Sequence, residues 1–451
     1  MQDMTQGAPG RHLLRYALPI LLGNWMQLAY NAVDSIIAGR FIGQNALAAE
    51  GIAAPLMNLA ILAISGACIG AGVLMSEAFG AQDTPCLRRT LATTLGFGTL
   101  LSAAAAVAGI AATPWLLYSL AVPPELHAMV ATYLRITFLG VPFTFWYNAL
   151  TAAFKSVGDS KTPLTVLAVA SVLNAALDLL LIGGLGFGLV CSAVTTVAAQ
   201  ACSVALAGGL LLAKLPQLCP RRTEWRPDPV LLRAVLRYGS VTALQQAVQP
   251  IGKVLIQGQV NALGVSAIAA FNAVTRVDDF AFTPEQGIAA AITTCLAQNR
   301  GANKRDRLRP AFAAGLRLEV CYWLLIGSAT LLLRRPVLSL FVAGEGAAQV
   351  VALGSAYLQW MALFYLLPGL TNGFQGFYRG MGKMKTTLLG TFTQTSLRVI
   401  GTVLLAPRLG LRGIALACAV GWSAMLAFEV PYYFYTCRKQ GLPRREGRAV
   451  L

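Results

Sequence analysis

The chain has 451 residues, of which 56% are hydrophobic and only 12% are charged. A soluble protein of this length would carry about twice that share of charged residues. The formal net charge of +17 would also suit a nucleic-acid-binding protein. However, the Lys and Arg residues lie in short loops between apolar runs, without the aromatic side chains on which bases stack. We therefore expect an integral membrane protein that binds no nucleic acid.

The apolar residues form twelve segments, six on each side of a basic loop that divides the chain into lobes 1–219 and 220–451. Each segment is long enough to cross a bilayer, which takes about 20 apolar residues in a helix. Because backbone polar groups inside a bilayer must be paired within the chain, we expect twelve α-helices. The segments are Leu13–Ala38, Ala49–Ser76, Leu91–Leu117, Ala128–Phe154, Pro163–Ile182, Gly188–Leu212, Leu231–Val260, Ala267–Ala297, Ala311–Leu333, Ala347–Phe377, Thr387–Leu405 and Gly413–Thr436.

The positions of the Lys and Arg residues predict the orientation. With the N-terminus inside, the cytoplasmic segments contain 25 of these residues and the outer loops contain five. Cytoplasmic loops of membrane proteins carry such an excess of positive charge. We therefore expect a multi-pass protein of the inner membrane with both termini in the cytoplasm.

The two halves of the chain resemble each other. Residues 154–164 match residues 378–388 at an offset of 224, and an offset of 221 pairs Gly43 with Gly264. Further pairs at these offsets are Gly186 with Gly410 and Gly80-Ala81 with Gly301-Ala302. Since six helices separate the copies, both copies run in the same direction through the membrane. The predicted fold is therefore an all-α integral membrane protein with two parallel six-helix repeats, a transporter architecture.

Two carboxylates inside apolar segments are the first candidates for function. Asp178 is the only charged residue of the segment Pro163–Ile182, and Asp34 lies in the first segment. An ionisable group at that depth costs about 2.5 kcal/mol or more and often marks an ion or substrate path. Asn174, one turn before Asp178, lies on the same helical face. An Asn–Asp pair that only joins two helices is the alternative, and the second acid makes it less attractive.

Other polar side chains surround these acids in the predicted N-terminal lobe. Together they offer carboxylate, amide, hydroxyl and phenol oxygens that can hold a hard cation such as Na+ or share a proton. Two adjacent carboxylates repel, so we expect one of them to hold a proton near neutrality. The residues added to Asp34, Asn174 and Asp178 are Gln27, Tyr30, Tyr133, Asn148 and Thr196.

The C-terminal copy lacks these acids. Asp178 corresponds to Thr402, Asn174 to Arg398, and Asp34 to Leu255. We therefore expect ion chemistry in the N-terminal half alone. The charges that could line a cavity in the C-terminal lobe are Lys253, Arg276, Asp278 and Arg398.

Other charged residues within the C-terminal segments are candidates for ion pairs. Asp279 is expected to pair with Arg276, one turn before it. Two roles remain possible for Lys253: its side chain lines a cavity, or it forms an ion pair with an acid of another helix. No role is assigned to the remaining intramembrane charges, Glu285, Arg317, Glu319 and Glu429.

Enzymatic functions find little support in the sequence. The two histidines, His12 and His127, lie at the starts of segments, and no zinc-protease motif or Gly-x-Ser-x-Gly elbow is present. The nine cysteines show no paired metal-ligand spacing. We expect no cofactor.

The order and spacing of several motifs resemble those of the multidrug and toxic compound extrusion (MATE) family, in its bacterial DinF-like branch. The motifs are Val33–Arg40 followed by Ala46–Ala49, the Gly-Ala pairs of both halves, Arg379–Gly382, and Asn174-x-x-x-Asp178 with Thr196 after it. The family belongs to the multidrug/oligosaccharidyl-lipid/polysaccharide flippase superfamily.

The resemblance implies export of amphipathic, often cationic drugs or metabolites in exchange for inward H+ or Na+. By position it implies a cation site at Asp34, Asn174, Asp178 and Thr196. It places a polar network around that site at Gln27, Tyr30, Tyr133 and Asn148. We expect a monomer in the lipid bilayer. The alternatives are a flippase for a lipid-linked saccharide precursor and a membrane-embedded enzyme.

Overall fold

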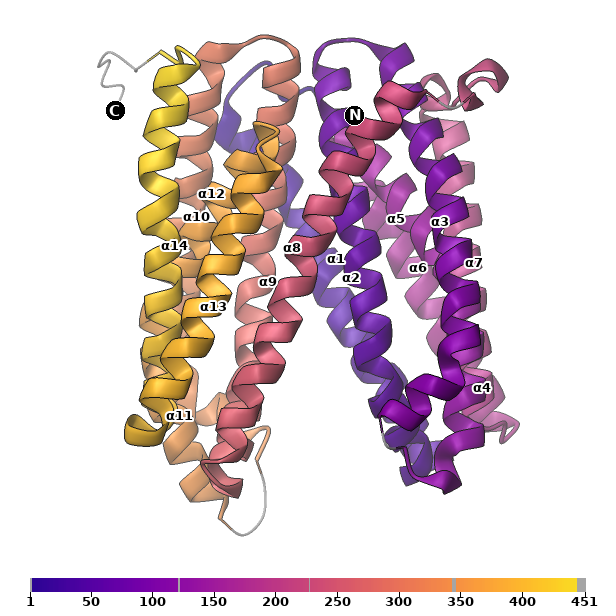
Figure 1. The fold of residues 1–451 in the computed structure, drawn as a ribbon, viewed down its shortest axis with the longest axis vertical. Coiled ribbons are helices and arrows are strands. Elements are labelled where there is room, and N and C mark those ends of the chain that lie inside the picture. The colour runs from indigo at the N-terminus through magenta and orange to yellow at the C-terminus, as the bar shows by residue number, and fades with distance from the viewer. Residues whose placement is uncertain (1, 121, 227, 343–345, 444–451) are drawn as a thin grey trace. The chain divides into compact units, whose positions relative to one another are not determined.

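The computed structural model describes the chain except for residues 1, 121, 227, 343–345 and 444–451. The described residues form helices and connecting turns, without strands. The helices of the first half are α1 (Pro9–Ile37), α2 (Gln44–Gly80), α3 (Thr84–Ser119), α4 (His127–Leu139), α5 (Val141–Ser156), α6 (Lys161–Asp178) and α7 (Leu189–Lys214). The helices of the second half are α8 (Pro229–Asn261), α9 (Val265–Gly301), α10 (Arg305–Ser339), α11 (Ala347–Phe364), α12 (Leu366–Gly380), α13 (Met384–Leu409) and α14 (Leu411–Lys439) (Figure 1).

The twelve predicted spans are confirmed, but two of them are broken. The fourth span consists of α4 and α5, which are separated at Gly140, and the tenth consists of α11 and α12, separated at Tyr365. Each break precedes a proline, Pro142 or Pro368, which has no N–H for the carbonyl four residues earlier. Among the described residues, nine helical stretches are long and apolar enough to cross a membrane by length and composition.

Turns at matching positions confirm the two parallel repeats. Gly43 and Gly264 have φ values of 106° and 93°, and each precedes the long helix of its repeat, α2 or α9. The φ values of Gln82 and Asn303, where these helices have ended, are 60° and 55°. Further pairs with positive φ are Gly158 with Gly382 and Gly186 with Gly410. Left-handed backbone is uncommon outside glycine, so its recurrence at offsets of 221 and 224 marks the same fold repeated.

The chain divides into two compact units. The N-terminal unit contains Met1–Gln2 and Pro19–Ala243, and the C-terminal unit contains Asp3–Leu18 and Leu244–Leu451. The predicted lobes, 1–219 and 220–451, differ from these units because α1 and α8 each begin in one unit and continue in the other. The beginning of α1 packs on the C-terminal unit, where the Tyr16 hydroxyl lies 3.1 Å from the Thr294 hydroxyl.

Small residues bring the beginning of α8 against α2 within the N-terminal unit. Gly66 and Gly70 of α2 are one turn apart and face Gly239 and Ala243 of α8. A Cβ atom at Gly70 would lie 2.6 Å from the backbone nitrogen of Gly239, and one at Gly66 would lie 2.6 Å from the Cα of Ala243. Paired small residues of this kind let membrane helices approach closely enough for their backbones to touch.

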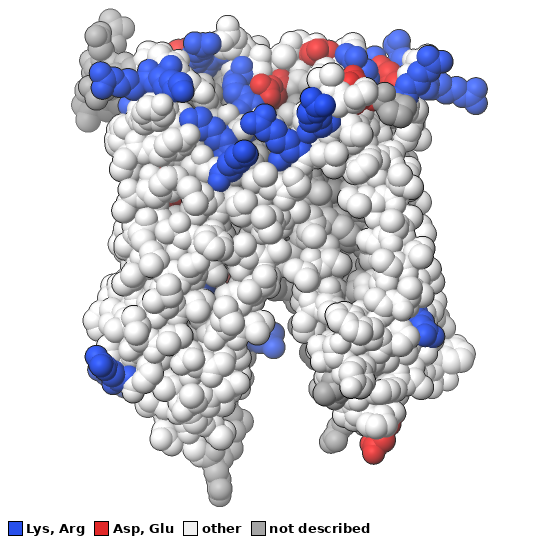
Figure 2. Space-filling model, in the orientation of Figure 1, with Lys and Arg blue, Asp and Glu red and all other residues white. Residues whose placement is uncertain are grey.

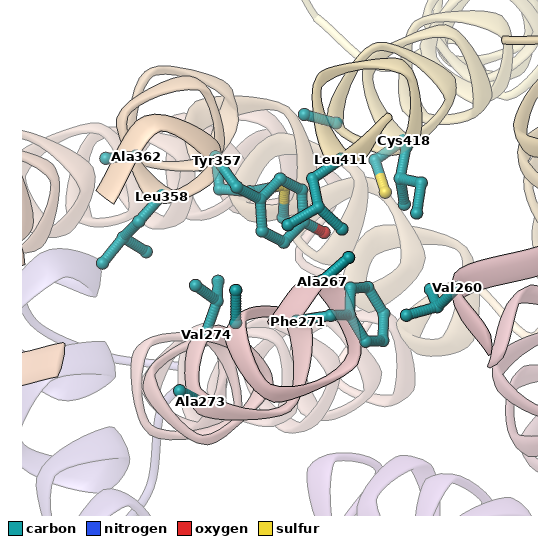
Figure 3. Packing of buried hydrophobic residues seen from close by; sticks show 14 of the residues in the cluster. Val260, Ala267, Phe271, Ala273, Val274, Tyr357, Leu358, Ala362, Leu411 and Cys418 are labelled. Carbon is teal, nitrogen blue, oxygen red and sulfur yellow. The ribbon is translucent and has the colours of Figure 1, made fainter. Parts of the chain in front are cut away.

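The C-terminal unit has an apolar core that joins α8, α9, α11 and α14 (Figure 3). Phe271 of α9 stacks on Tyr357 of α11, with ring centroids 5.9 Å apart. Val260 of α8 and Cys418 of α14 are completely buried in the same cluster. This packing holds the helices that carry the buried acids of the unit.

Basic side chains gather at one end of the helices in each unit (Figure 2). In the N-terminal unit, Arg88 Nη2 lies 2.9 Å from Glu224 Oε1, which belongs to the short helix η5 (Arg222–Trp225). Burial alone would raise the pKa of Glu224, but hydrogen bonds from the Arg221 backbone and the Arg88 side chain hold it below its ordinary value. This ion pair fastens the loop before α8 to the start of α3.

Candidate functional site

Asp178 is the centre of a buried polar cluster between α6 and α7. Its side chain is completely buried, and Oδ1 accepts a hydrogen bond from the Thr195 hydroxyl. When the Asn174 amide, which is 1% exposed, is oriented so that both of its polar atoms find partners, it donates to Asp178 Oδ2 at 3.0 Å and accepts from the Thr196 backbone N–H at 3.2 Å. Both oxygens of the carboxylate are therefore held by neighbouring side chains. A carboxylate in a bilayer core is tolerated only with such partners.

Asp34 brings a second carboxylate to this cluster from α1. It lies close enough to Asp178 for the two carboxyl groups to interact. Tyr30, one turn earlier in α1, lies close to Thr196. Two ionised carboxylates this close together inside an apolar helix bundle would repel each other. A proton on either of them would relieve that repulsion.

Glu50 of α2 adds a third acid that the sequence analysis missed. Its charge acts on Asp34, Asp178 and Tyr133, and its buried Oε1 has no hydrogen-bond partner in the described structure. Glu50 is the second residue of a predicted apolar segment, so it resembled a residue at the membrane surface. The N-terminal unit thus gathers carboxyl groups from α1, α2 and α6.

Two π-helical turns lie directly after the acids of α1 and α6. The α1 helix continues as η1 (Ala38–Ile42), and α6 ends at Asp178 itself, where η3 (Leu179–Gly184) begins. The two turns touch, because a Cβ atom at Gly183 would lie 3.4 Å from the ring of Phe41. Turns of this type are rare and occur frequently at functional sites.

Two predicted members of the polar network make local hydrogen bonds. Gln27 Nε2 donates to Asn31 Oδ1 at 3.2 Å on the exposed face of α1. Asn148 Nδ2 donates at 2.8 Å to the Thr144 carbonyl of its own helix. The structure therefore groups Asp34, Asn174, Asp178 and Thr196 with Tyr30 and Tyr133, and it adds Glu50, Ser192 and Thr195. Ser192 and Thr195 are three residues apart in α7, so they lie on the same face of the helix. This spacing can be read from the sequence.

The predicted charges of the C-terminal unit occupy different environments. The pair expected between Arg276 and Asp279 is wrong, because Asp279 Oδ1 lies 3.1 Å from Lys253 Nζ of α8 and Arg276 is exposed. Asp278 is buried and accepts a hydrogen bond from the Tyr365 hydroxyl at 2.6 Å. Arg398 of α13 is close enough to Asp278 for their charges to interact.

The comparisons with known proteins decide the family. The family model described as MatE matches the chain twice, over residues 19–180 and 242–404. The chain belongs to the MATE family. The two matched stretches correspond to the two repeats, and they begin close to Pro19 and Leu244, where α1 and α8 pass from one unit into the other.

Curated relatives of this MATE protein are transporters. It is 28% identical over 438 residues to a probable multidrug resistance protein, YpnP, of Bacillus subtilis, with 96% of each chain covered. It is 26% identical over 371 residues to an FAD transporter of Shewanella oneidensis, with 79% of this chain and 77% of the relative covered. This MATE protein is therefore a transporter of small molecules and not an enzyme, and MATE transporters need no cofactor.

A solved structure confirms the fold of this MATE protein. A MOP superfamily transporter from Pyrococcus furiosus superposes with a TM-score of 0.88 at 21% identity, covering 98% of each chain. The protein is a multi-pass membrane protein with the twelve-helix MATE fold. The family and its multidrug resistance relatives assign it to the efflux of drugs or metabolites.

Proposed function

We propose that this MATE transporter is a secondary antiporter that exports amphipathic organic cations in exchange for H+. The observation that carries the proposal is the pair of neighbouring carboxyl groups of Asp34 and Asp178, which lies inside an apolar helix bundle. The hydrogen bonds that Asp178 accepts come from neutral side chains. Such a pair holds one proton and one negative charge. It can take up a proton from one side of the membrane and release it to the other.

Coupling follows from competition between the proton and the substrate for the same negative charge. A ligand shifts a conformational equilibrium only by its difference in affinity for the two states. When a cationic substrate enters the N-terminal unit, the charge of Glu50 and of the Asp34–Asp178 pair attracts it and favours release of the proton. Protonation neutralises the pair and favours release of the substrate. In parallel-repeat transporters these steps alternate with opening of the path to either side.

The hydrogen bonds of Asp178 support H+ over Na+ as the coupling ion. Sodium needs several oxygens close around it. Both Asp178 oxygens already accept hydrogen bonds from Thr195 and Asn174, which leaves fewer lone pairs to face a metal ion. Sodium that reaches the site competes for the same carboxylates.

The proposal includes the orientation of the protein in the membrane and its oligomeric state. The protein lies in the bacterial inner membrane as a monomer with both termini in the cytoplasm. The strong excess of Lys and Arg in the loops that share the side of the termini supports this orientation.

Proteoliposomes loaded with a fluorescent organic cation test the function. We expect efflux under a pH gradient in buffers without Na+, and no efflux under a Na+ gradient at symmetric pH. An anionic flavin nucleotide added as a competitor should leave the efflux of the cation unchanged, although a relative is an FAD transporter. Efflux that follows the Na+ gradient alone would overturn proton coupling, and inhibition by the flavin nucleotide would overturn the preference for cations. The absence of efflux under both gradients would contradict the proposal that the protein is an antiporter.

A further inference from the structure

Two buried glutamates of the C-terminal unit face each other without a counter-ion. Glu285 of α9 and Glu319 of α10 are each 1% exposed. Neither belongs to an ion pair within the described part of the chain. The sequence places both glutamates within apolar segments, but the correspondence between the repeats does not pair them with Asp34 or Asp178.

The two carboxyl groups reach one small space beside α12. A Cβ atom at Gly369 would lie 3.6 Å from Glu319 Oε2 and 3.7 Å from Glu285 Oε1. Asn372, one turn along α12, donates from Nδ2 to Glu285 Oε2 at 3.3 Å. Both oxygens of Glu319 are buried without a hydrogen-bond partner in the described structure. A buried carboxylate without any donor is strongly unfavourable, so Glu319 requires a bound ligand that supplies positive charge or a donor.

The groups around the pair do not supply that charge. On α9, Asp278 adds a further negative charge, and one of its oxygens is occupied by the Tyr365 hydroxyl. On α10, Tyr322 is close to both glutamates, but its hydroxyl donates to the Ala281 carbonyl at 2.8 Å. On α12, Asn372 contributes a single long hydrogen bond. Two ionised carboxylates in this setting would repel each other at low dielectric, whereas one proton makes one group neutral and gives it a donor.

We propose that Glu285 and Glu319 form a second proton-binding site, enclosed by α9, α10 and α12 of the C-terminal unit. The site takes a proton and not a metal ion, because the Asn372 amide presents its N–H to Glu285 and supplies no oxygen to a cation at that point. Its existence is independent of the Asp34–Asp178 pair. The sequence predicts ion chemistry in the N-terminal half alone, and this site extends it to both units.

Infrared difference spectroscopy of the purified full-length protein tests the proposal. Spectra are recorded as the pH is changed, so that the proton is the ligand tested. All variants are made in the double variant Asp34→Asn/Asp178→Asn, which lacks the N-terminal pair. We expect a pH-dependent carbonyl band of a protonated carboxylic acid that is lost in both Glu285→Gln and Glu319→Gln. Proton release on raising the pH should fall by about one proton per protein in each variant. The control is Glu429→Gln, which removes an equally buried glutamate of α14. The band assigned to the pair should persist in this control.

A second variant distinguishes a bound proton from a bound metal ion and leaves both carboxyl groups in place. Gly369→Ala places a methyl group at ordinary contact distance from both carboxyl groups, so the helix can accept it. The methyl group fills space that a metal ion would need, but a shared proton needs no such space. We expect the band and its pH dependence to survive in Gly369→Ala and to be unaffected by Na+. Persistence of the band in both glutamine variants would overturn the site. Loss of the band on adding Na+ at constant pH would overturn its assignment to a proton.

Discussion

Asp178→Asn should reduce gradient-driven export to the level of liposomes without protein, while the protein stays folded in the membrane. Asparagine has nearly the same shape, and its amide oxygen can still accept the hydrogen bond from Thr195. However, the amide carries no charge and cannot exchange a proton with Asp34. Asp34→Asn should give the same loss, since either change leaves a single carboxylate in the pair. Export from proteoliposomes under a pH gradient measures the effect.

The matched control is Asp306→Asn, which neutralises an exposed acid in the first turn of α10. We expect it to export at the wild-type rate. Circular dichroism and gel filtration of the three variants show whether they are folded. Normal export by Asp178→Asn at every pH tested would show that the coupling site lies elsewhere.

Gly70→Ala should strongly destabilise the protein. The new Cβ would lie 2.6 Å from backbone atoms of Tyr238 and Gly239, and a backbone cannot turn aside as a flexible side chain can. Forcing α2 and α8 apart should cost about 3 kcal/mol, at the upper end of overpacking effects. Thermal unfolding in detergent, followed by the amount of monodisperse protein, measures the loss.

Gly96→Ala is the control for the chemical change itself. Gly96 lies in α3, and apart from the nearby backbone of its own helix no atom lies within 4 Å of the position that its Cβ would take. Because alanine favours a helix over glycine by about 1 kcal/mol, this variant should be as stable as the wild type or more stable. Equal melting temperatures for Gly70→Ala and Gly96→Ala would contradict a close contact between α2 and α8.

The sequence predicted those features that depend on local pattern. The apolar segments, the offsets between the repeats and the spacing of Asn174 and Asp178 all reappear in the structure. The breaks at Gly140 and Tyr365 were missed because proline is common within membrane helices, so Pro142 and Pro368 alone did not indicate them. The passage of α1 and α8 between the units was also missed. It depends on contacts between distant small residues such as Gly70 and Gly239.

The candidate site was predicted in part for the same reason. Asp34 and Asp178 are unusual in apolar segments, so they were visible in the sequence. Glu50 was not, because an acid at the beginning of a segment usually lies at the membrane surface. The predicted partner of Asp279 was wrong. Arg276 is one turn away in the same helix and is visible as a neighbour in the sequence, whereas the contact with Lys253 depends on how two helices pack. Glu285 and Glu319 become a pair only when α9 and α10 pack together.

Release of protons on substrate binding tests the central claim most directly. The claim is that the pair Asp34–Asp178 exchanges a proton for a cationic substrate. In weakly buffered detergent solution, addition of an organic cation to the purified protein should release protons, which a pH-sensitive dye detects. We predict release of about one proton per wild-type protein, because the pair holds a single proton. We predict no release from the variant Asp34→Asn/Asp178→Asn. Equal release from the wild type and this variant would contradict the account.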